Sequence, residues 1–185
     1  MITLHITLTK DNPIFQKARA RSKTGAMGHI GTHFDCYTLP PSASHYELPG
    51  IVLDCQKGLP EIDACRNLPN LTGKALLLHT ANEETNGYGN DAYFKRETSF
   101  TDEALKEILE NHHPAFIVID SHGIGPSGAI HTARDVLCEK HNCHVIENTN
   151  LGALAGKTQV TLIIDVDTTN PSTGKPCKVY AKDTA

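Results

Sequence analysis

The sequence predicts an α/β fold in which a mixed sheet packs against two or three helices. Several short apolar runs have the length of buried strands, and two longer segments place apolar residues at helical spacing. Strands interspersed with helices in this way are typical of α/β domains. With 185 residues and 39% hydrophobic content, the chain is long enough to bury one core. We therefore expect a single domain over residues 1–185.

The predicted elements follow one another along the chain as short strands and helices. Apolar and polar residues alternate over 1–8, which favours a strand, whereas 11–28 is polar and irregular. Residues 29–37 are compatible with an extended chain, and the prolines within 39–49 indicate a loop. The other predicted elements are a strand at 50–55, a helical turn within 59–68, a strand at 73–80, a long polar loop at 81–98, a helix at 101–112, a strand at 114–120, a glycine-rich turn at 121–128, a helix at 130–140, and strands at 144–147, 160–166 and 177–181.

The helix at 101–112 has the clearest boundaries. Thr101 is a suitable N-cap, and Asp102 and Glu103 place negative charge in the first turn, where the helix dipole favours it. Pro114 disfavours a helical conformation in the residue before it, so the helix should end near His112.

The composition argues against several classes of partner. A net charge of −4 and a pI near 6.2 give no basic face for nucleic acid or an anionic membrane. The first residues do not resemble a signal peptide, and no apolar run approaches the roughly 18 residues that span a bilayer. The six cysteines include no Cys-x-x-Cys pair, which favours reduced thiols. We expect a cytoplasmic protein with a small-molecule substrate.

The segment Gly28 to Asp35 carries the most informative chemistry. His29, His33 and Asp35 lie at relative positions 0, 4 and 6, and even offsets place side chains on one face of an extended strand. Two imidazoles and one carboxylate suit zinc, manganese or ferrous iron. Three protein ligands also leave positions open for water, as a catalytic metal requires. The alternative is a polar loop that satisfies its own hydrogen bonds.

The sequence HIGTHFD at 29–35 resembles the metal-binding motif of the cyclase family, which includes bacterial kynurenine formamidases and isatin hydrolases. That motif reads His, any residue, Gly, Thr, His, any residue, Asp, any residue, Pro, any residue, His. Other segments that resemble the family are LTGKALLLHT, FTDEALKEI, FIVIDSHGIGP, VIENTNLGAL and GKPCKVYA. The resemblance covers most of the chain and is most specific at the metal motif.

The resemblance implies a swivelling β/β/α domain that forms a homodimer or homotetramer. It also implies a divalent metal, Zn or Mn, that activates water to attack an amide or ester carbonyl. By resemblance, His29, His33 and Asp35 are the metal ligands. Glu147 would approach the same metal or a second one, and we expect it to act in catalysis as well.

The sequence departs from the family pattern after Asp35. Tyr37 and Leu39 stand where the family has Pro and its usual general base, a histidine. Asp135 stands twelve residues before Glu147, where the family tends to have a histidine for a second metal. We interpret Asp135 as an ordinary aspartate of a helix surface, with metal ligation as the alternative, and expect one metal.

Another group must then move the proton, and our first choice is His122, in the glycine-rich turn after Asp120. A purely structural turn is an equally good interpretation of this segment. The other candidates are Asp135 and Glu147, followed by the less supported His45 and His131.

We therefore predict a metal-dependent hydrolase of a C–N bond in an amide, a formamide or a cyclic amide. Because Leu39 replaces the family histidine, we do not expect kynurenine formamidase activity itself. The alternative is a family member that kept the metal and the fold but lost catalysis, and serves as a binding or regulatory protein. A third possibility is a structural metal held by four protein ligands.

Overall fold

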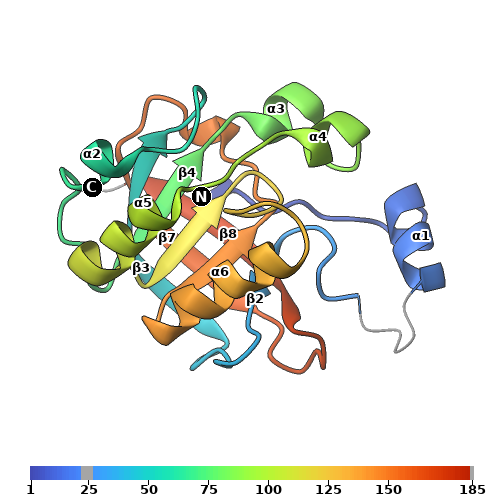
Figure 1. The fold of residues 1–185 in the computed structure, drawn as a ribbon. Coiled ribbons are helices and arrows are strands. Elements are labelled where there is room, and N and C mark those ends of the chain that lie inside the picture. Colours follow the sequence, from blue (N-terminus) through green and yellow to red (C-terminus); the bar gives the residue numbers. More distant parts are fainter. Residues whose placement is uncertain (22–26, 184–185) are drawn as a thin grey trace.

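The computed structural model describes residues 1–21 and 27–183 and has the predicted α/β fold (Figure 1). The strands are β1 (Ile2–Thr3), β2 (His33–Asp35), β3 (His45–Asp54), β4 (Ala75–His79), β5 (Phe116–Ile119), β6 (His144–Glu147), β7 (Gln159–Val166) and β8 (Gly174–Asp183). The helices are α1 (Pro13–Arg21), α2 (Ile62–Cys65), α3 (Asn82–Asn86), α4 (Asp91–Lys95), α5 (Asp102–Glu107) with its π-helical continuation η1 (Ile108–His112), α6 (Ala129–Lys140) and the 3-10 turn η2 (Gly152–Leu154).

The strands form one mixed sheet that closes on itself. Their order is β1-β8-β2-β6-β5-β4-β3-β7, and β7 also pairs with β8. The central strands β3, β4, β5 and β6 are parallel, whereas β2, β7 and β8 pair with their neighbours in antiparallel fashion. The prediction of an α/β fold with a mixed sheet is confirmed.

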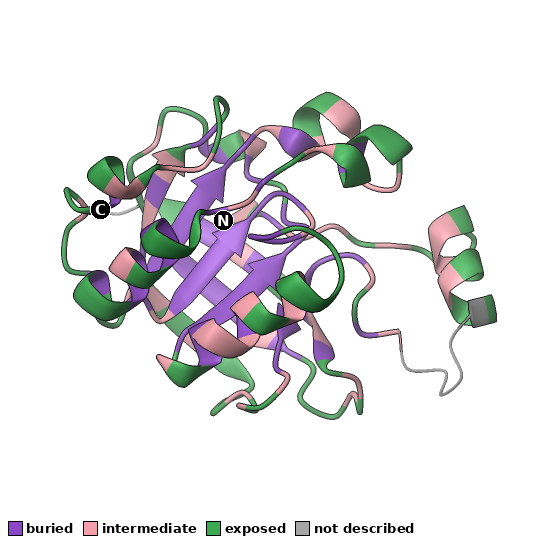
Figure 2. Ribbon diagram, in the orientation of Figure 1, coloured by how far each residue is buried: buried purple, intermediate pink, exposed green. Residues whose placement is uncertain are grey.

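Alternate residues of the parallel strands enter two separate cores. On β4, Ala75 and Leu77 point into the closed sheet, while Leu76 and Leu78 point to its outer face. All four are fully buried, which explains why this strand appears in the sequence as a continuous apolar run. The strands are accordingly buried along most of their length (Figure 2).

The outer face of the parallel strands is covered by α2, α5 and α6 (Figure 1). The α5–η1 segment buries Leu105, Ile108 and Leu109 against this face. Its start is the predicted one, because the Thr101 hydroxyl accepts a hydrogen bond from Ala104 N at 3.1 Å. Its last turn is π-helical and ends at His112, so both predicted boundaries are confirmed.

The prediction that residues 11–28 are irregular is wrong for Pro13–Arg21, which forms α1. The Asn12 side chain accepts a hydrogen bond from Ile14 N at 2.9 Å, and Pro13 occupies the first helical position. An Asn cap followed by Pro is a known helix start that the polar composition concealed. Residues 22–26 of the predicted irregular stretch lie outside the described residues.

The prediction of a loop over 39–49 is wrong for its last part, because β3 begins at His45. Residues 45–49 pair only with β7, and β4 joins from Gly50 onward. Pro49 is therefore tolerated, since the strand has a neighbour on one side only at that point. Within the predicted loop 81–98, α3 and α4 are two further short helices.

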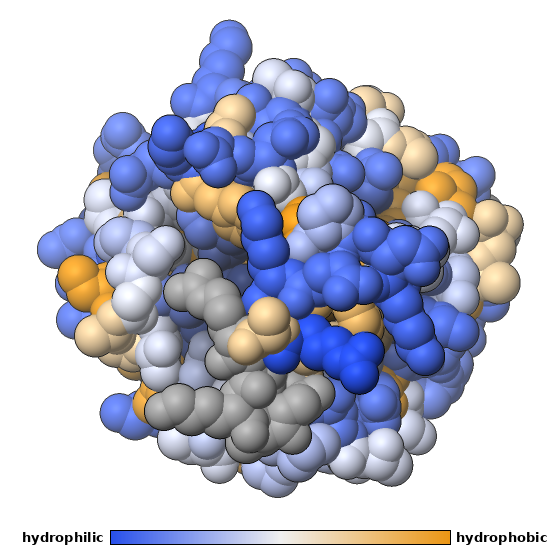
Figure 3. All heavy atoms as spheres, turned by 90° about the vertical axis from the view of Figure 1, so that its right-hand side faces the viewer, coloured by the Kyte–Doolittle hydropathy of each residue, from blue (hydrophilic) through white to orange (hydrophobic). Residues whose placement is uncertain are grey.

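None of the helices in the described ranges is long and apolar enough to cross a bilayer. Figure 3 shows the face of the molecule on the α1 side, where hydrophilic residues predominate and hydrophobic residues form small separate patches.

Candidate metal centre

Strand β2 brings His33 and Asp35 to one face, as their even spacing predicts. His33 lies directly opposite Glu147 in the antiparallel pairing of β2 with β6. Residues paired in this way have their side chains on the same face. The His33 Nε2 atom therefore lies 3.5 Å from Asp35 Oδ1 and 3.6 Å from Glu147 Oε2. The register of one strand pair thus assembles three of the four predicted ligands.

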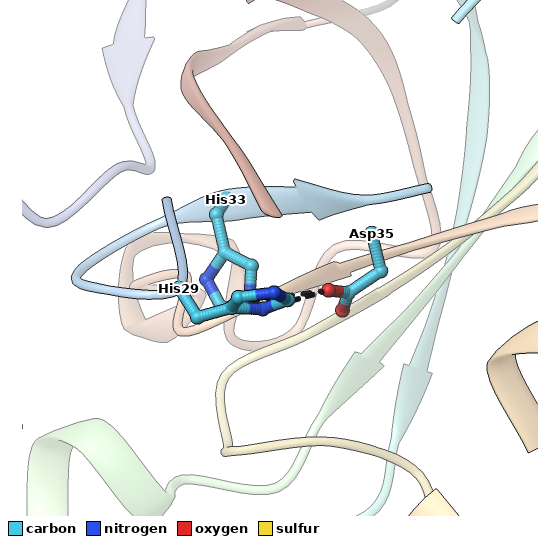
Figure 4. Close-up of side chains that lie close together, drawn as sticks. All are labelled: His29, His33 and Asp35. Atoms are coloured by element: carbon cyan, nitrogen blue, oxygen red, sulfur yellow. Dashed lines mark hydrogen bonds and ion pairs between the residues drawn. The ribbon is translucent and has the colours of Figure 1, made fainter. Parts of the chain in front are cut away.

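His29 reaches the same point by another route (Figure 4). The predicted extended segment 29–37 is a strand only over His33–Asp35, and the chain turns at Gly31, whose φ is +66°. The even-offset argument therefore fails for His29. The turn nevertheless folds its imidazole back, with Nδ1 3.1 Å from Asp35 Oδ1 and 3.2 Å from His33 Nε2. The side chain is 39% exposed, so it lies on the solvent side of the cluster.

Helix α6 adds two residues that the sequence did not favour as metal ligands. His131 and Asp135 are one helical turn apart, and His131 Nε2 lies 3.3 Å from Asp135 Oδ2 and 3.2 Å from Glu147 Oε1. Asp135 is 1% exposed, so its interpretation as a helix-surface aspartate is wrong. The structure contains two overlapping groups of potential metal ligands that share Asp35: His29, His33 and Asp35, and Asp35, His131, Asp135 and Glu147.

The carboxylates of this metal-ligand cluster lack ordinary partners. Both oxygens of Asp35, both of Asp135 and Oε1 of Glu147 are buried without a hydrogen bond of good geometry, although imidazole nitrogens lie nearby. A buried charge without a partner is strongly unfavourable. Carboxylate oxygens and imidazole nitrogens that converge in poor hydrogen-bond geometry are the arrangement that a shared cation would satisfy. The residues therefore fit a divalent metal.

The titration properties of the cluster follow from its crowding. Burial, reinforced by the charges of Asp35 and Glu147, raises the pKa of Asp135 to about 9. The close approach of the Glu147 carboxylate outweighs burial at His131 and raises the pKa of its imidazole to about 9. At His33 burial opposes protonation, but the Asp35 and Glu147 carboxylates raise the pKa to about 9. Without a cation, the cluster therefore holds protons in place of metal charge.

His122 lies beside the cluster rather than in it. Its ring faces Tyr93 and Phe94, with centroid distances of 6.1 and 5.9 Å. Burial lowers its pKa, while the charge of Glu147 acts in the opposite direction. Asp120 accepts hydrogen bonds from Thr80 N, Thr80 Oγ1 and Ala81 N, so the start of this turn has a structural role.

The remaining predicted positions lie elsewhere. His45 forms an exposed ion pair with Asp165, with His45 Nδ1 2.7 Å from Asp165 Oδ1, and belongs to neither ligand group. The amide N–H of Leu39 donates to Glu139 Oε2 at 2.9 Å, and its side chain lines a separate cavity with Tyr46 and His144.

A signal for His131 and Asp135 was present in the sequence. Their spacing places both on one face of the predicted helix. Two side chains of metal-ligating types, one helical turn apart, can supply two ligands of a metal site. What the sequence lacked was the direction of that face.

The structure resembles solved metal-dependent hydrolases. A potential metal-dependent hydrolase with cyclase activity matches with a TM-score of 0.75 and 14% identity, over 99% of this chain and 97% of that one. Isatin hydrolase A from Labrenzia aggregata, bound to benzyl benzoate, matches with a TM-score of 0.70 and 18% identity, over 100% and 93%. Isatin hydrolase A from Ralstonia solanacearum matches with a TM-score of 0.65 and 16% identity, over 83% and 72%.

No family model and no curated protein matches the chain. The structural matches establish a shared fold, and the cyclase-like fold predicted from HIGTHFD is confirmed.

Proposed function

From the fold that the chain shares with cyclase-like metal-dependent hydrolases, we propose that it is a metal-dependent hydrolase of a C–N bond in an amide, a formamide or a cyclic amide. The observation that carries this proposal is the buried cluster in which carboxylate oxygens of Asp35, Asp135 and Glu147 have no hydrogen bond of good geometry. Buried carboxylates normally have well-formed hydrogen bonds, so three that contact only imidazoles in poor hydrogen-bond geometry favour a ligand role.

We assign the ligand role to His29, His33, Asp35 and Glu147, and add His131 and Asp135 from α6. A mixed set of imidazole and carboxylate ligands suits zinc or manganese. A cation bound there would polarise a carbonyl oxygen and lower the pKa of a water ligand. The exposed edge of His29 provides the side from which a substrate would enter.

His122 remains our choice for the group that moves a proton. Its lowered pKa keeps the imidazole neutral at pH 7, so it can accept a proton. It also lies close enough to Glu147 for that carboxylate to influence its charge. Glu147 is the second choice, because one of its oxygens has no hydrogen bond.

A metal-binding regulatory protein is the second candidate function. It is favoured by Leu39, which stands where the family has its general base and whose amide is bound to Glu139. In this case the cluster would bind metal without supporting turnover.

Elemental analysis of the purified protein tests the ligand assignment first. We expect at least one zinc or manganese per chain after reconstitution, and loss of that metal in His33→Ala. His45→Ala is the matched control, because His45 lies in an exposed pair and belongs to neither ligand group. Equal metal content in the unmodified protein, His33→Ala and His45→Ala, or no metal in any of them, would overturn the proposal.

Turnover separates the two candidate functions. The metal-loaded protein should release amine or carboxylate from a panel of amides, formamides and lactams, and His122→Gln should lower kcat while the metal content stays unchanged. Metal binding without turnover of any substrate in the panel would favour the regulatory protein.

A further inference from the structure

Beyond the ligand cluster, the structure contains a buried hydrogen-bond chain that ends on the ring of His33. The Tyr93 hydroxyl donates to Asn148 Oδ1 at 2.9 Å. The Asn148 amide Nδ2 then donates to the carbonyl of Gly31 at 3.2 Å and lies 3.4 Å from His33 Nδ1. His33 Nδ1 lies 2.9 Å from the same Gly31 carbonyl.

We propose that Tyr93 and Asn148 are positioning residues that fix the orientation and the tautomer of His33 at the metal centre. A hydrogen on Nδ1 that is donated to the Gly31 carbonyl leaves the lone pair of His33 on Nε2. That nitrogen faces Asp35 and Glu147. The inference rests on the proposed function only in that His33 is a ligand.

The donor and acceptor roles along the chain admit one consistent direction. Because the Gly31 carbonyl can only accept, the Asn148 amide must turn its NH₂ group toward it, and Asn148 Oδ1 then accepts from the Tyr93 hydroxyl. The Gly31 carbonyl therefore accepts from both the amide and the imidazole, which aligns the ring. Replacing the Tyr93 hydroxyl removes the hydrogen bond that holds the oxygen end of this amide.

Burial and backbone geometry support a role beyond packing. Tyr93 is fully buried, Asn148 is 3% exposed and His33 is 2% exposed. Solvent water therefore does not readily replace a hydrogen bond that is lost here. Asn148 also has a φ of +54°, a conformation that favours glycine. Strain of this kind is concentrated at functional sites, and Asn148 directly follows Glu147.

The backbone amide of Gly31 is held as well. Its N–H donates to the Tyr88 hydroxyl at 3.0 Å. Tyr88 and Tyr93 both come from the segment that contains α3 and α4, so this segment contacts the turn directly through Tyr88 and indirectly through Asn148. Such outer contacts tune the affinity of metal sites elsewhere.

A cobalt titration of the full chain tests the proposal. Co²⁺ reports its ligand geometry in the visible absorption bands, and the titration also gives a Kd. We expect Tyr93→Phe to weaken Co²⁺ binding roughly tenfold or more and to change the band positions. Tyr46→Phe is the matched control, since its hydroxyl accepts an exposed contact from Ala43 N.

Asn148→Gly provides a second, independent variant. Glycine keeps the positive φ but removes the amide, so the backbone is preserved while the chain of hydrogen bonds is broken. We expect the same loss of affinity, and little further loss in the double variant with Tyr93→Phe, because both changes break one path. Circular dichroism and thermal midpoints verify that each variant is folded.

The outcomes separate this inference from the proposed function. If the unmodified protein binds no Co²⁺, the proposed function itself fails. If it binds Co²⁺ and the folded Tyr93→Phe and Asn148→Gly variants match it in Kd and spectrum, the positioning role is overturned while the metal centre stands. Should Tyr93→Phe fail to fold, Asn148→Gly alone decides between these outcomes.

Discussion

Asp135 makes the metal-free protein less stable than it could be, and its replacement tests the electrostatics of the cluster. We choose Asp135→Asn because asparagine has the same shape and cannot ionise. The pKa of Asp135 in the folded chain is raised from 3.8 to about 9 by burial and by the charges of Asp35 and Glu147. At pH 7 the folded protein therefore keeps this group protonated, whereas the unfolded chain ionises it.

The magnitude follows from the linkage between proton binding and folding. Between pH 3.8 and pH 7 the unfolded state gains about 1.4 kcal/mol for each pH unit, or at most about 4 kcal/mol, by ionising Asp135. In the variant the unfolded state lacks this ionisation free energy, because asparagine cannot ionise. Because neighbouring charges adjust together, we expect Asp135→Asn to stabilise the metal-free protein by about 2 to 4 kcal/mol at pH 7.

The sign of the pH dependence follows from the raised pKa values. A group with a raised folded pKa contributes stability that is fully present below its unfolded pKa and is lost as the pH rises through its folded pKa. For Asp135 this window runs from 3.8 to about 9, and for His33 and His131 from 6.5 to about 9. The unmodified, metal-free protein should therefore lose stability steadily from pH 4 to pH 9, and the variant should lose less.

Urea unfolding with a chelator present, at pH 5, 7 and 9, measures both effects. Asp91→Asn is the control, because its side chain is 95% exposed. Added Mn²⁺ should reverse the order, since the metal stabilises the chain that keeps all its carboxylates. A metal-free variant that is no more stable than the unmodified protein at pH 7, or has the same pH slope, would refute the reasoning.

Two further predictions concern the surroundings of the site. Glu139 is 4% exposed and accepts hydrogen bonds from the backbone amides of Tyr37, Thr38 and Leu39. Glu139→Gln should place the NH₂ group of glutamine opposite one of these donors and lower the unfolding free energy by about 1 to 3 kcal/mol in urea titrations. Unchanged stability would contradict this role. Thr101→Ala removes the N-cap of α5 and should lower the unfolding free energy by about 1 kcal/mol, whereas Thr101→Ser should keep the unfolding free energy of the unmodified protein.

The parallel strands could be predicted because their burial on both faces leaves a continuous apolar run. Leu76, Leu77 and Leu78 are all fully buried, on alternating sides of the sheet, and no polar residue interrupts them. The start of β3 could not be predicted in this way. Its first residues pair with one neighbouring strand only and alternate between exposed and half-buried. Pro49 therefore led to the prediction of a loop over these residues.

The candidate site was partly predictable for a related reason. The even spacing of His33 and Asp35 corresponds to a real strand, whereas His29 reaches the cluster through the turn at Gly31, which periodicity cannot describe. Glu147 depends on the register between β2 and β6, and its place was available only from the family resemblance. Long-range pairing of this kind leaves no trace in local sequence.

Asp135 shows why a helix surface cannot be assigned from the helix alone. Along α6 the buried residues are Asp135, Cys138 and Glu139, so two of the three inward positions are acidic. The spacing of the apolar residues in α6 therefore does not identify the face of the helix that is buried. Asp135 meets the ligand cluster, and Glu139 binds the loop that follows Asp35. Two acidic side chains of α6 are thus buried alongside the apolar Cys138, and a bound cation would secure the same helix that supplies its ligands.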